Sequence, residues 1–278
     1  MAIIYDTPEI FLTKTNHSYP YGNDLVFEDF FLQKFRNKMP DVKRTYIPVQ
    51  WTCFYISRDY GNQPMTDLQE FLDNIPRDGK YFTVVQWDDG ILNNLDGLDI
   101  IRFASGGIGD YPYPLNNLPH NKTNRDRDIF ASFIGVINGR HRIREKLAQS
   151  HMGKQGYLIA NSMGFPSFKE AMERSIFALC PRGYGRTSFR INEALNFGAI
   201  PVYIYDDPWI PFRDEIDFNE YGVLIHESEI EKIDDILKSY SESDIEKMRK
   251  KGQEVYKEYY LYDGCYNKII EKVNKWEV

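Results

Sequence analysis

The stretch that decides the fold is residues 175–207, which read SIFALCPRGYGRTSFRINEALNFGAIPVYIYDD. An apolar run ends at Cys180 and is typical of a buried strand. A turn with Gly183 and Gly185 follows, and then a helical pattern over residues 187–197. Residues 199–205 form a second apolar run. A strand, a glycine turn, a helix and a strand in this order predict a parallel α/β sheet.

The turn in this stretch has the features of an anion site. A helix that starts beyond it offers free backbone N–H groups and the positive end of its dipole. Glycines let the backbone approach a phosphate closely, and arginines suit bidentate phosphate contact. We therefore predict a phosphate site made of Arg182, Gly183, Tyr184, Gly185, Arg186, Thr187, Ser188 and Arg190. The alternative interpretation is a tight turn with solvated arginines.

The predicted helix also carries a carboxylate near this site. At about 100° per residue, Ile191, Ala194 and Leu195 form the buried stripe, and Glu193 falls on the adjoining flank with Arg190. A carboxylate there suits a ribose diol, because each oxygen accepts a hydroxyl hydrogen bond. An ion pair with Arg190 is the alternative, and both can hold at once.

Length and alternation predict two domains. The chain has 278 residues, enough for two domains of roughly 100–150 residues. Residues 105–128 are rich in Gly, Pro and Asn and form either an interdomain connection or a long active-site loop. We predict a first domain over residues 1–125 and a second over 126–278, with a C-terminal helix that can cross back to the first.

Strands and helices alternate in both halves, which favours parallel sheets. In the first half we expect helices over 23–38 and 66–75 and strands over 45–51, 81–86 and 98–104. In the second half we expect strands over 129–137, 175–180, 199–205 and 221–226, with helices over 139–149, 168–174 and 187–197.

Composition excludes several classes of protein. With 34 basic and 41 acidic residues, a net charge of −7 argues against a nucleic-acid binder. Cys53, Cys180 and Cys265 lie far apart and lack metal-ligand spacing, so we expect reduced thiols and no metal. No apolar run approaches a membrane span and no signal peptide is evident, so we expect a soluble, cytoplasmic protein. The GxxxxGK[ST] loop of many kinases is missing.

Several motifs together resemble the exostosin family, glycosyltransferase family 47. They are PRGYGRTSFRINEAL and GAIPVYIYDD, with RDIFASFIGVINGRHRIREKL upstream and YGVLIHESEI downstream. The resemblance covers residues 127 to about 258, whereas the first 125 residues match loosely through VVQWDDG. The length is similar to that of short soluble viral members, the chlorovirus-type xylosyltransferases.

The resemblance implies the GT-B fold, two Rossmann-like domains facing across a cleft, and a particular reaction. A sugar, xylose as a first choice, moves with inversion from a UDP-sugar to a glycan acceptor hydroxyl. The family does not depend on a DxD-bound metal, and Asp206 with Asp207 lacks that spacing, so neither metal nor other cofactor is expected. Asp207 shapes the donor loop or touches the sugar hydroxyls.

The resemblance also suggests residue roles. Arg182, Arg186 and the helix N-terminus stabilise the leaving diphosphate, with Arg182 counted as catalytic. Arg140 is a further diphosphate ligand, or an ordinary basic helix start. Tyr184 stacks on the base, or simply packs.

The general base is expected from the N-terminal half. Asp88 is the first choice because it follows a strand and precedes Gly90, with Asp89, Asp110 and His120 as alternatives. A surface turn aspartate is the competing interpretation of Asp88. The competing function is a non-catalytic sugar- or nucleotide-binding module, or an inactive partner subunit. Arg182, Arg186 and Glu193 favour an enzyme, because a lectin needs no diphosphate site.

Overall fold

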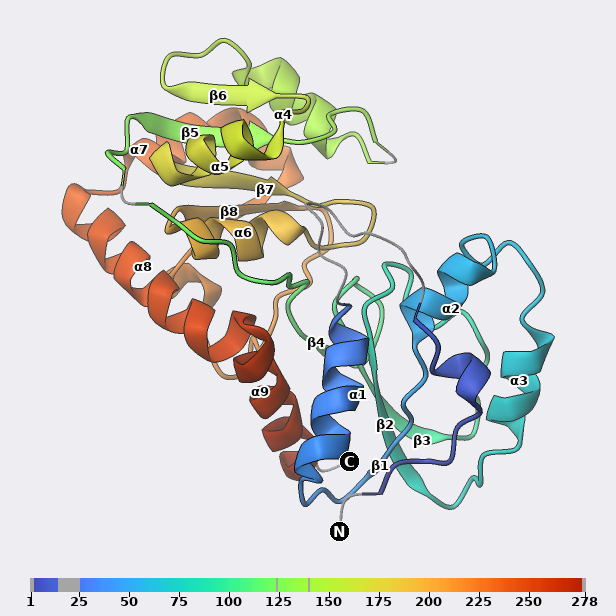
Figure 1. Ribbon diagram of the computed structural model, residues 1–278. Coiled ribbons are helices and arrows are strands. Elements are labelled where there is room, and N and C mark those ends of the chain that lie inside the picture. Colours follow the sequence, from blue (N-terminus) through green and yellow to red (C-terminus); the bar gives the residue numbers. More distant parts are fainter. Residues whose placement is uncertain (1–2, 15–25, 124, 140, 277–278) are drawn as a thin grey trace. The chain divides into compact units, whose positions relative to one another are not determined.

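The computed structural model describes residues 3–14, 26–123, 125–139 and 141–276 (Figure 1). The chain divides into two compact units, which are Met1–Tyr113 with Tyr262–Val278, and Pro114–Leu261. The expected return of the C-terminal helix to the first domain is confirmed, whereas the expected boundary after residue 125 differs from the one observed after Tyr113. The difference has a local cause, because Asn116 donates to the carbonyl of Tyr260 within the second unit. Tyr262, in contrast, packs on Phe27 of the first unit, with ring centroids 5.3 Å apart.

The first unit is a parallel sheet in the order β1-β2-β3-β4. Its strands are β1 (Thr45–Tyr46), β2 (Lys80–Val85), β3 (Asp99–Ala104) and β4 (Tyr111–Pro112). Its helices are α1 (Phe27–Lys38), α2 (Trp51–Ser57), α3 (Thr66–Asp73) and α9 (Tyr262–Lys275), with a 3-10 turn, η1 (Glu9–Phe11).

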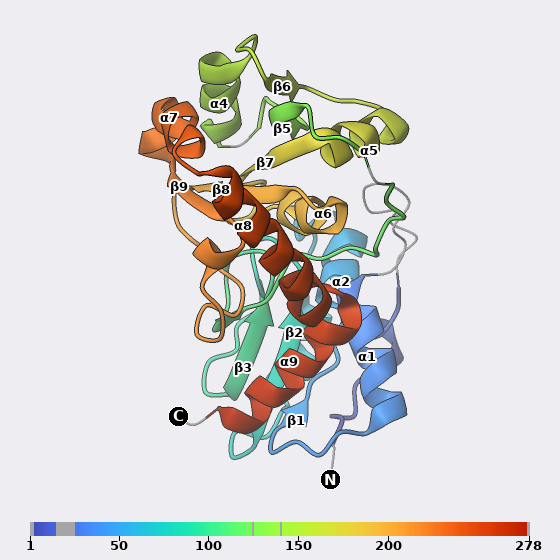
Figure 2. The same ribbon diagram turned by 90° about the vertical axis from the view of Figure 1, so that its left-hand side faces the viewer.

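Aromatic side chains fill the core of the first unit. Phe31 of α1 packs on Tyr46 of β1 and on Tyr266 of α9, with ring centroids 5.2 and 4.9 Å apart. Helices α1 and α9 therefore lie side by side, as Figures 1 and 2 both show. The apolar spacing predicted for residues 23–38 is the buried face of α1; residues 23–25 lie outside the described part.

The expected strand over residues 45–51 is wrong beyond Tyr46. Pro48 has no N–H to give to a ladder, and at Gln50 the carbonyl already accepts the first helical bond, from Phe54. The buried carboxylate of Glu28 then accepts from the backbone N–H of Thr52 at 3.0 Å. This bond satisfies an N-terminal donor of α2, a helix that the sequence did not predict.

The second unit is a five-stranded parallel sheet in the order β6-β5-β7-β8-β9. The strands are β5 (Ile129–Ile134), β6 (Tyr157–Ala160), β7 (Ser175–Pro181), β8 (Ile200–Tyr205) and β9 (Val223–His226). The helices are α4 (Ile143–His151), α5 (Phe165–Arg174), α6 (Phe189–Phe197), α7 (Ile233–Lys238) and α8 (Glu242–Val255). The remaining turns are η2 (Phe218–Glu220), η3 (Glu227–Lys232) and η4 (Tyr256–Tyr260), a π-helical turn.

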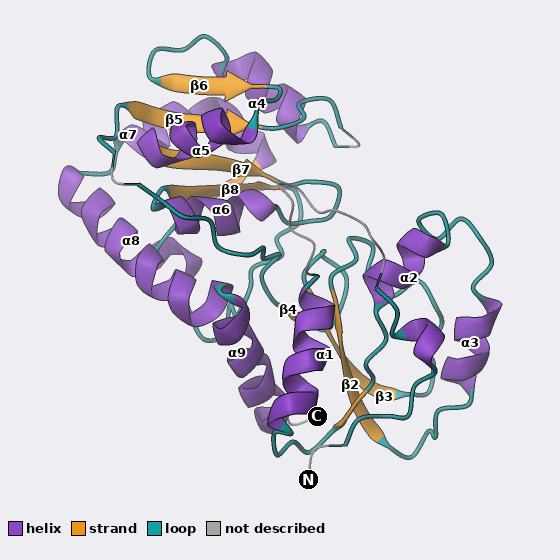
Figure 3. Ribbon diagram, viewed as in Figure 1, coloured by secondary structure: helices purple, strands orange, loops and turns teal. Residues whose placement is uncertain are grey.

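Helices cover both faces of this sheet. Side chains of α4, α7 and α8, such as Leu147, Leu237 and Met248, share one apolar cluster with Phe177 and Val202 of the strands. Helices α5 and α6 lie on the other face (Figures 1 and 3). Each unit is thus a parallel α/β layer, and the prediction of a GT-B chain with two Rossmann-like domains is confirmed.

Within the described residues, no helix is both long and apolar enough to cross a bilayer.

Candidate functional site

The strand order of the second unit creates a crevice between β5 and β7. The chain leaves β5 toward β6 on one side, whereas β7 lies on the other side. In doubly wound sheets, ligands bind outside the carboxyl ends of the strands at such a switch point. Here β5 and β7 end at Ile134 and Pro181. The predicted phosphate turn, residues 182–188, therefore starts at this crevice.

Side chains from both sides meet at the crevice. Arg144 donates to the carbonyl of Val136, beyond β5, and to the carbonyl of Arg182, beyond β7, both at 3.1 Å. A Cβ added at Gly135 would lie 3.4 Å from Nη2 of Arg190, so this α6 arginine lies beside the end of β5. The two edges of the crevice are therefore connected by arginines.

Arg182 uses its guanidinium inside the turn. Nη1 donates to both carboxylate oxygens of Asp206 at 2.6 and 2.8 Å. Nε donates to the carbonyl of Gly185 at 3.0 Å and Nη2 to that of Tyr184 at 3.3 Å. Partial burial raises the pKa of Asp206, but the bonds and charge of Arg182 outweigh it and hold the pKa below its usual value. Arg182 thus fixes the turn, and its direct contact with a diphosphate stays a prediction.

Arg186 is placed differently. It is 37% exposed and pairs with Asp207 at 2.9 Å. Asp207 is itself 54% exposed, so this pair lies in solvent and can open for an anionic ligand. Tyr184 is 56% exposed, which leaves its ring accessible for stacking. The sequence placed Arg140 in the same site; it lies outside the described residues.

Helix α6 starts at the predicted site with a conventional cap. Ser188 has extended backbone geometry, and its hydroxyl accepts from the backbone N–H of Arg190 at 3.3 Å. The carbonyl of Thr187 accepts from the N–H of Gly183 at 2.8 Å and closes the turn. A Cβ at Gly183 would lie 3.2 Å from Nη2 of Arg144, so a larger residue would press on the crevice. Thr187 and Ser188 are both buried.

Glu193 is the most unusual group in the crevice. Its side chain is 1% exposed, and Oε2 pairs with Nη1 of Arg190. The guanidinium of Arg190 also stacks over Phe168, with 4.4 Å from Cζ to the ring centroid. Oε1 of Glu193 is buried and has no hydrogen-bond partner among the described residues. The pair with Arg190 exists, and the contact of the second carboxylate oxygen with a ribose hydroxyl stays a prediction.

The first unit holds the predicted base in a constrained turn. Asp88 and Asp89 form a turn after β2 in which the N–H of Gly90 donates to the carbonyl of Trp87 at 3.0 Å. A Cβ at Gly106 would lie 2.4 Å from Cα of Asp88, so a glycine is required for this close approach. Asp88 is half-buried.

The alternative bases lie in other surroundings. Asp110 accepts from Arg102 through both oxygens, at 2.9 and 2.7 Å, and is held as a structural ion pair. His120 belongs to the second unit, not to the first as expected. Its ring stacks on Phe197 with an interplanar angle of 3°, and burial lowers its pKa.

Sequence reasoning missed three groups at the carboxyl ends of the first sheet. Both amide atoms of Gln50, Nε1 of Trp87 and Oγ of Ser105 are buried without a hydrogen-bond partner among the described residues. Trp87 and Ser105 directly follow the predicted strands over 81–86 and 98–104, and Gln50 is the penultimate residue of the overlong one over 45–51. A polar residue immediately after an apolar run was the available signal. Unpaired buried polar atoms of this kind point to a ligand with hydroxyl groups.

The described residues contain no group of three or more His, Cys, Asp or Glu side chains that could hold a metal ion. Metal independence stays a prediction.

Burial raises the pKa of the Cys180 thiol well above its ordinary value. This thiol, which ends the apolar run before the turn, is therefore unreactive. Cys53 and Cys265 are also buried and form no disulfide.

Comparison with known proteins agrees with the motifs. The exostosin GT47 domain matches residues 107–240, a segment that includes the turn at 182–188 and α6. A probable glucuronosyltransferase of Oryza sativa subsp. japonica is 49% identical over 74 residues, 27% of this chain and 18% of the relative. The probable beta-1,4-xylosyltransferase IRX10 of Arabidopsis thaliana is 45% identical over 73 residues, 26% of this chain and 18% of IRX10.

The matched stretch thus spans less than a fifth of these relatives. A solved structure, Anabaena Alr3699/HepE in complex with UDP-glucose, aligns with a TM-score of 0.42 and 11% identity over 93% of this chain and 85% of that chain. The family match rests on the sequence of the segment that builds the crevice. Residues 107–240, with the arginine turn and Glu193, match the exostosin GT47 domain.

Proposed function

We propose that this protein is an inverting glycosyltransferase that moves a sugar from a UDP-sugar to a glycan acceptor hydroxyl without a metal ion. Xylose is the proposed sugar. One relative is named a probable beta-1,4-xylosyltransferase and another a probable glucuronosyltransferase, so two donors have support. The transferred sugar is therefore the first point to test.

The observation that carries the proposal is Oε1 of Glu193, a buried carboxylate oxygen without a partner among the described residues. It lies in α6, whose N-terminus starts at the switch-point crevice. A ribose hydroxyl donates the hydrogen bond that this oxygen lacks, and the diphosphate then extends toward the helix N-terminus and Arg186. The arrangement fits the two chemically distinct halves of a nucleoside diphosphate.

The reaction breaks the bond between the anomeric carbon and the diphosphate oxygen while the acceptor oxygen bonds to the opposite face of that carbon. Negative charge grows on the leaving diphosphate, where Arg186 and the N–H groups of α6 stabilise it. Arg182 holds the turn and Asp206 in position. No covalent intermediate with the protein is needed.

The acceptor hydroxyl must lose its proton, and we assign this step to Asp88. The turn that carries Asp88 is held by Gly106. The unpaired polar atoms of Gln50, Trp87 and Ser105 are proposed to bind acceptor hydroxyls. The aromatic rings of Tyr60 and Trp87, with centroids 6.2 Å apart, offer a sugar-stacking face beside them.

A donor screen tests the proposal. Thermal unfolding is measured with UDP- and GDP-sugars in EDTA, because a ligand at ~100 times its dissociation constant adds roughly 2.7 kcal/mol of stability. UDP-sugars should stabilise the protein, and the stabilising donor should be consumed when a glycan acceptor is added. Stabilisation without donor hydrolysis or transfer would indicate a binding module. No stabilisation by any nucleotide sugar would reject the donor site.

A further inference from the structure

A basic pocket of about 490 Å³ lies within the second unit, away from the crevice. Its lining comes from the segment before β5, the end of α6, one side of α8 and Lys257 of η4. Six of its lining residues are cationic, namely Lys122, Arg125, Arg127, Arg249, Lys250 and Lys257, and two are anionic, Glu246 and Glu254. This excess of positive charge is unexpected in a chain with a net charge of −7.

The two innermost arginines are fixed in place by backbone carbonyls. Nη2 of Arg127 donates to the carbonyl of Phe197 at 2.8 Å, and Nε of Arg249 donates to that of Gly198 at 3.2 Å. Among the described residues, no carboxylate forms an ion pair with Arg127. The base of the pocket therefore carries an immobile positive charge, which is the arrangement that preorganised anion sites use.

The cations also repel one another. Burial and the charge of Arg249 together lower the pKa of Arg127 to about 10, although the charges of Glu173 and Glu246 oppose the fall. Burial lowers the pKa of Lys122 in the same way, with added repulsion from Arg127, Lys257 and Arg249. A bound anion would relieve this repulsion and restore ordinary pKa values.

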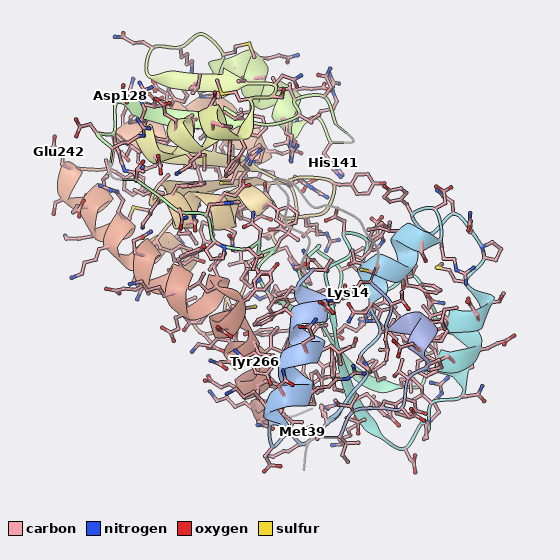
Figure 4. The ribbon with its side chains drawn as sticks, viewed as in Figure 1. Lys14, Met39, Asp128, His141, Glu242 and Tyr266 are labelled. Atoms are coloured by element: carbon pink, nitrogen blue, oxygen red, sulfur yellow. The ribbon has the colours of Figure 1, made fainter. Side chains whose placement is uncertain are left out.

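The pocket is distinct from the crevice because it lies at the opposite edge of the sheet. Arg127 precedes β5 and Gly198 precedes β8, so both mark amino ends of parallel strands, whereas the crevice lies at carboxyl ends. A strand of six residues such as β5 is roughly 20 Å long. Figure 4 shows the two edges, with Asp128 at the start of β5 and His141 beyond its end.

We propose that this pocket binds a compact, multivalent oxyanion, such as a diphosphate or a small sugar carrying several anionic groups. Its six cations outnumber its two carboxylates by four, which exceeds what one monovalent ion needs, and its volume of about 490 Å³ holds more than a single orthophosphate. Lys250 and Lys257 are exposed at the rim and reach a ligand without rearrangement of the core. The site is independent of the donor crevice and of the proposed glycosyl transfer.

Calorimetric titration with pyrophosphate tests the site, at constant ionic strength and with excess UDP to fill the crevice. Wild type should bind one equivalent. The double variant Lys250→Gln/Lys257→Gln should bind at least about tenfold more weakly, because it loses two charges at the rim of the pocket. The matched control is Lys232→Gln/Lys247→Gln, which removes the same charge from exposed positions outside the pocket.

Three results would overturn the proposal. Wild type does not bind pyrophosphate, or both double variants bind it as tightly as wild type, or the pocket variant and the control variant lose the same pyrophosphate affinity. A second titration uses trigalacturonate, which carries its charges on an extended sugar chain. If trigalacturonate binds more tightly than pyrophosphate, the ligand of this pocket is not compact. UDP affinity is measured in the same samples and should not change in the pocket variant. Failure of UDP binding would reject the donor site alone, because the lysine variants still report on this pocket.

Discussion

Nη1 of Arg182 donates to both carboxylate oxygens of Asp206, at 2.6 and 2.8 Å, and joins the turn after β7 to the end of β8. Arg182 is 8% exposed, and its Nε and Nη2 atoms donate to carbonyls of the turn. The guanidinium therefore organises the loop that precedes α6. Arg186, in contrast, forms an exposed pair with Asp207, and we propose that it meets the diphosphate.

Asp206→Asn should loosen this loop. We expect weaker UDP binding and a loss of about 1 kcal/mol in the free energy of unfolding at pH 7, because the pair is partly exposed. Asp207→Asn, at a more exposed position, should change stability less.

The pKa of Asp206 is lowered in the folded state. The stability that this carboxylate gives the folded protein is therefore present above the unfolded pKa of about 3.9 and is lost as pH falls through the folded pKa. Urea unfolding of Asp206→Asn and wild type should therefore differ at pH 7 and converge at low pH; a constant difference would argue against this pair.

Asp88→Asn tests the proposed base. The turnover number should fall by roughly 10² to 10⁴, the usual contribution of a positioned acid or base, while UDP affinity stays nearly unchanged. Arg186→Ala should instead damage both, because it meets charge that grows on the leaving diphosphate. Wild-type turnover in a folded Asp88→Asn protein would pass the role to Asp89, Asp110 or His120.

Gly106→Ala tests whether the turn positions Asp88. The added Cβ would lie 2.3 Å from the carbonyl oxygen of Trp87 and 2.4 Å from Cα of Asp88, so the turn must move. A misplacement of this size should lower turnover by about 10²-fold and leave UDP affinity intact. Gly164→Ala is the matched control, because nothing lies within 4 Å of its added Cβ. Equal turnover in the two variants would show that the turn tolerates displacement.

Glu28 should make stability depend on pH. Burial raises its pKa from 4.5 to about 7, although bonds from Gln86 and Thr52 oppose the rise. The folded state then binds the proton more tightly, so this stabilisation is present below pH 4.5 and is lost as pH rises through 7. We expect the free energy of unfolding to fall by about 3 kcal/mol relative to Glu28→Gln between these values. Parallel curves for the two proteins in urea titrations from pH 4.5 to 8 would show an ordinary pKa.

The sequence predicted the second unit well because its signals are local. The apolar run to Cys180, the glycine turn and the stripe of Ile191, Ala194 and Leu195 all follow from neighbouring residues. The start of α6 near Ser188 was predicted on the same grounds, and the pair between Arg190 and Glu193 was one of the two roles considered for Glu193. Edge strand β6, which is half-buried throughout and only four residues long, was missed.

The first unit depended on contacts between distant residues. Helix α2 begins where Glu28, from α1, accepts from Thr52, and no local pattern reveals that partner. The unit boundary after Tyr113 was likewise hidden, because Asn116 joins the second unit through a hydrogen bond to the carbonyl of the distant Tyr260. Unpaired atoms on Gln50 and Ser105 become visible only when burial is known.

Calorimetric titration with UDP in EDTA, on wild type and Glu193→Gln, tests the central claim most directly. Glu193→Gln keeps the shape of the side chain and removes the charge whose Oε1 atom lacks a partner among the described residues. Wild type should bind UDP without metal, and the variant should bind more weakly by about 1–3 kcal/mol, the range for a hydrogen bond to a charged group. Unaltered UDP affinity in a folded variant would make Glu193 only the partner of Arg190, and no UDP binding by wild type would contradict the donor site itself.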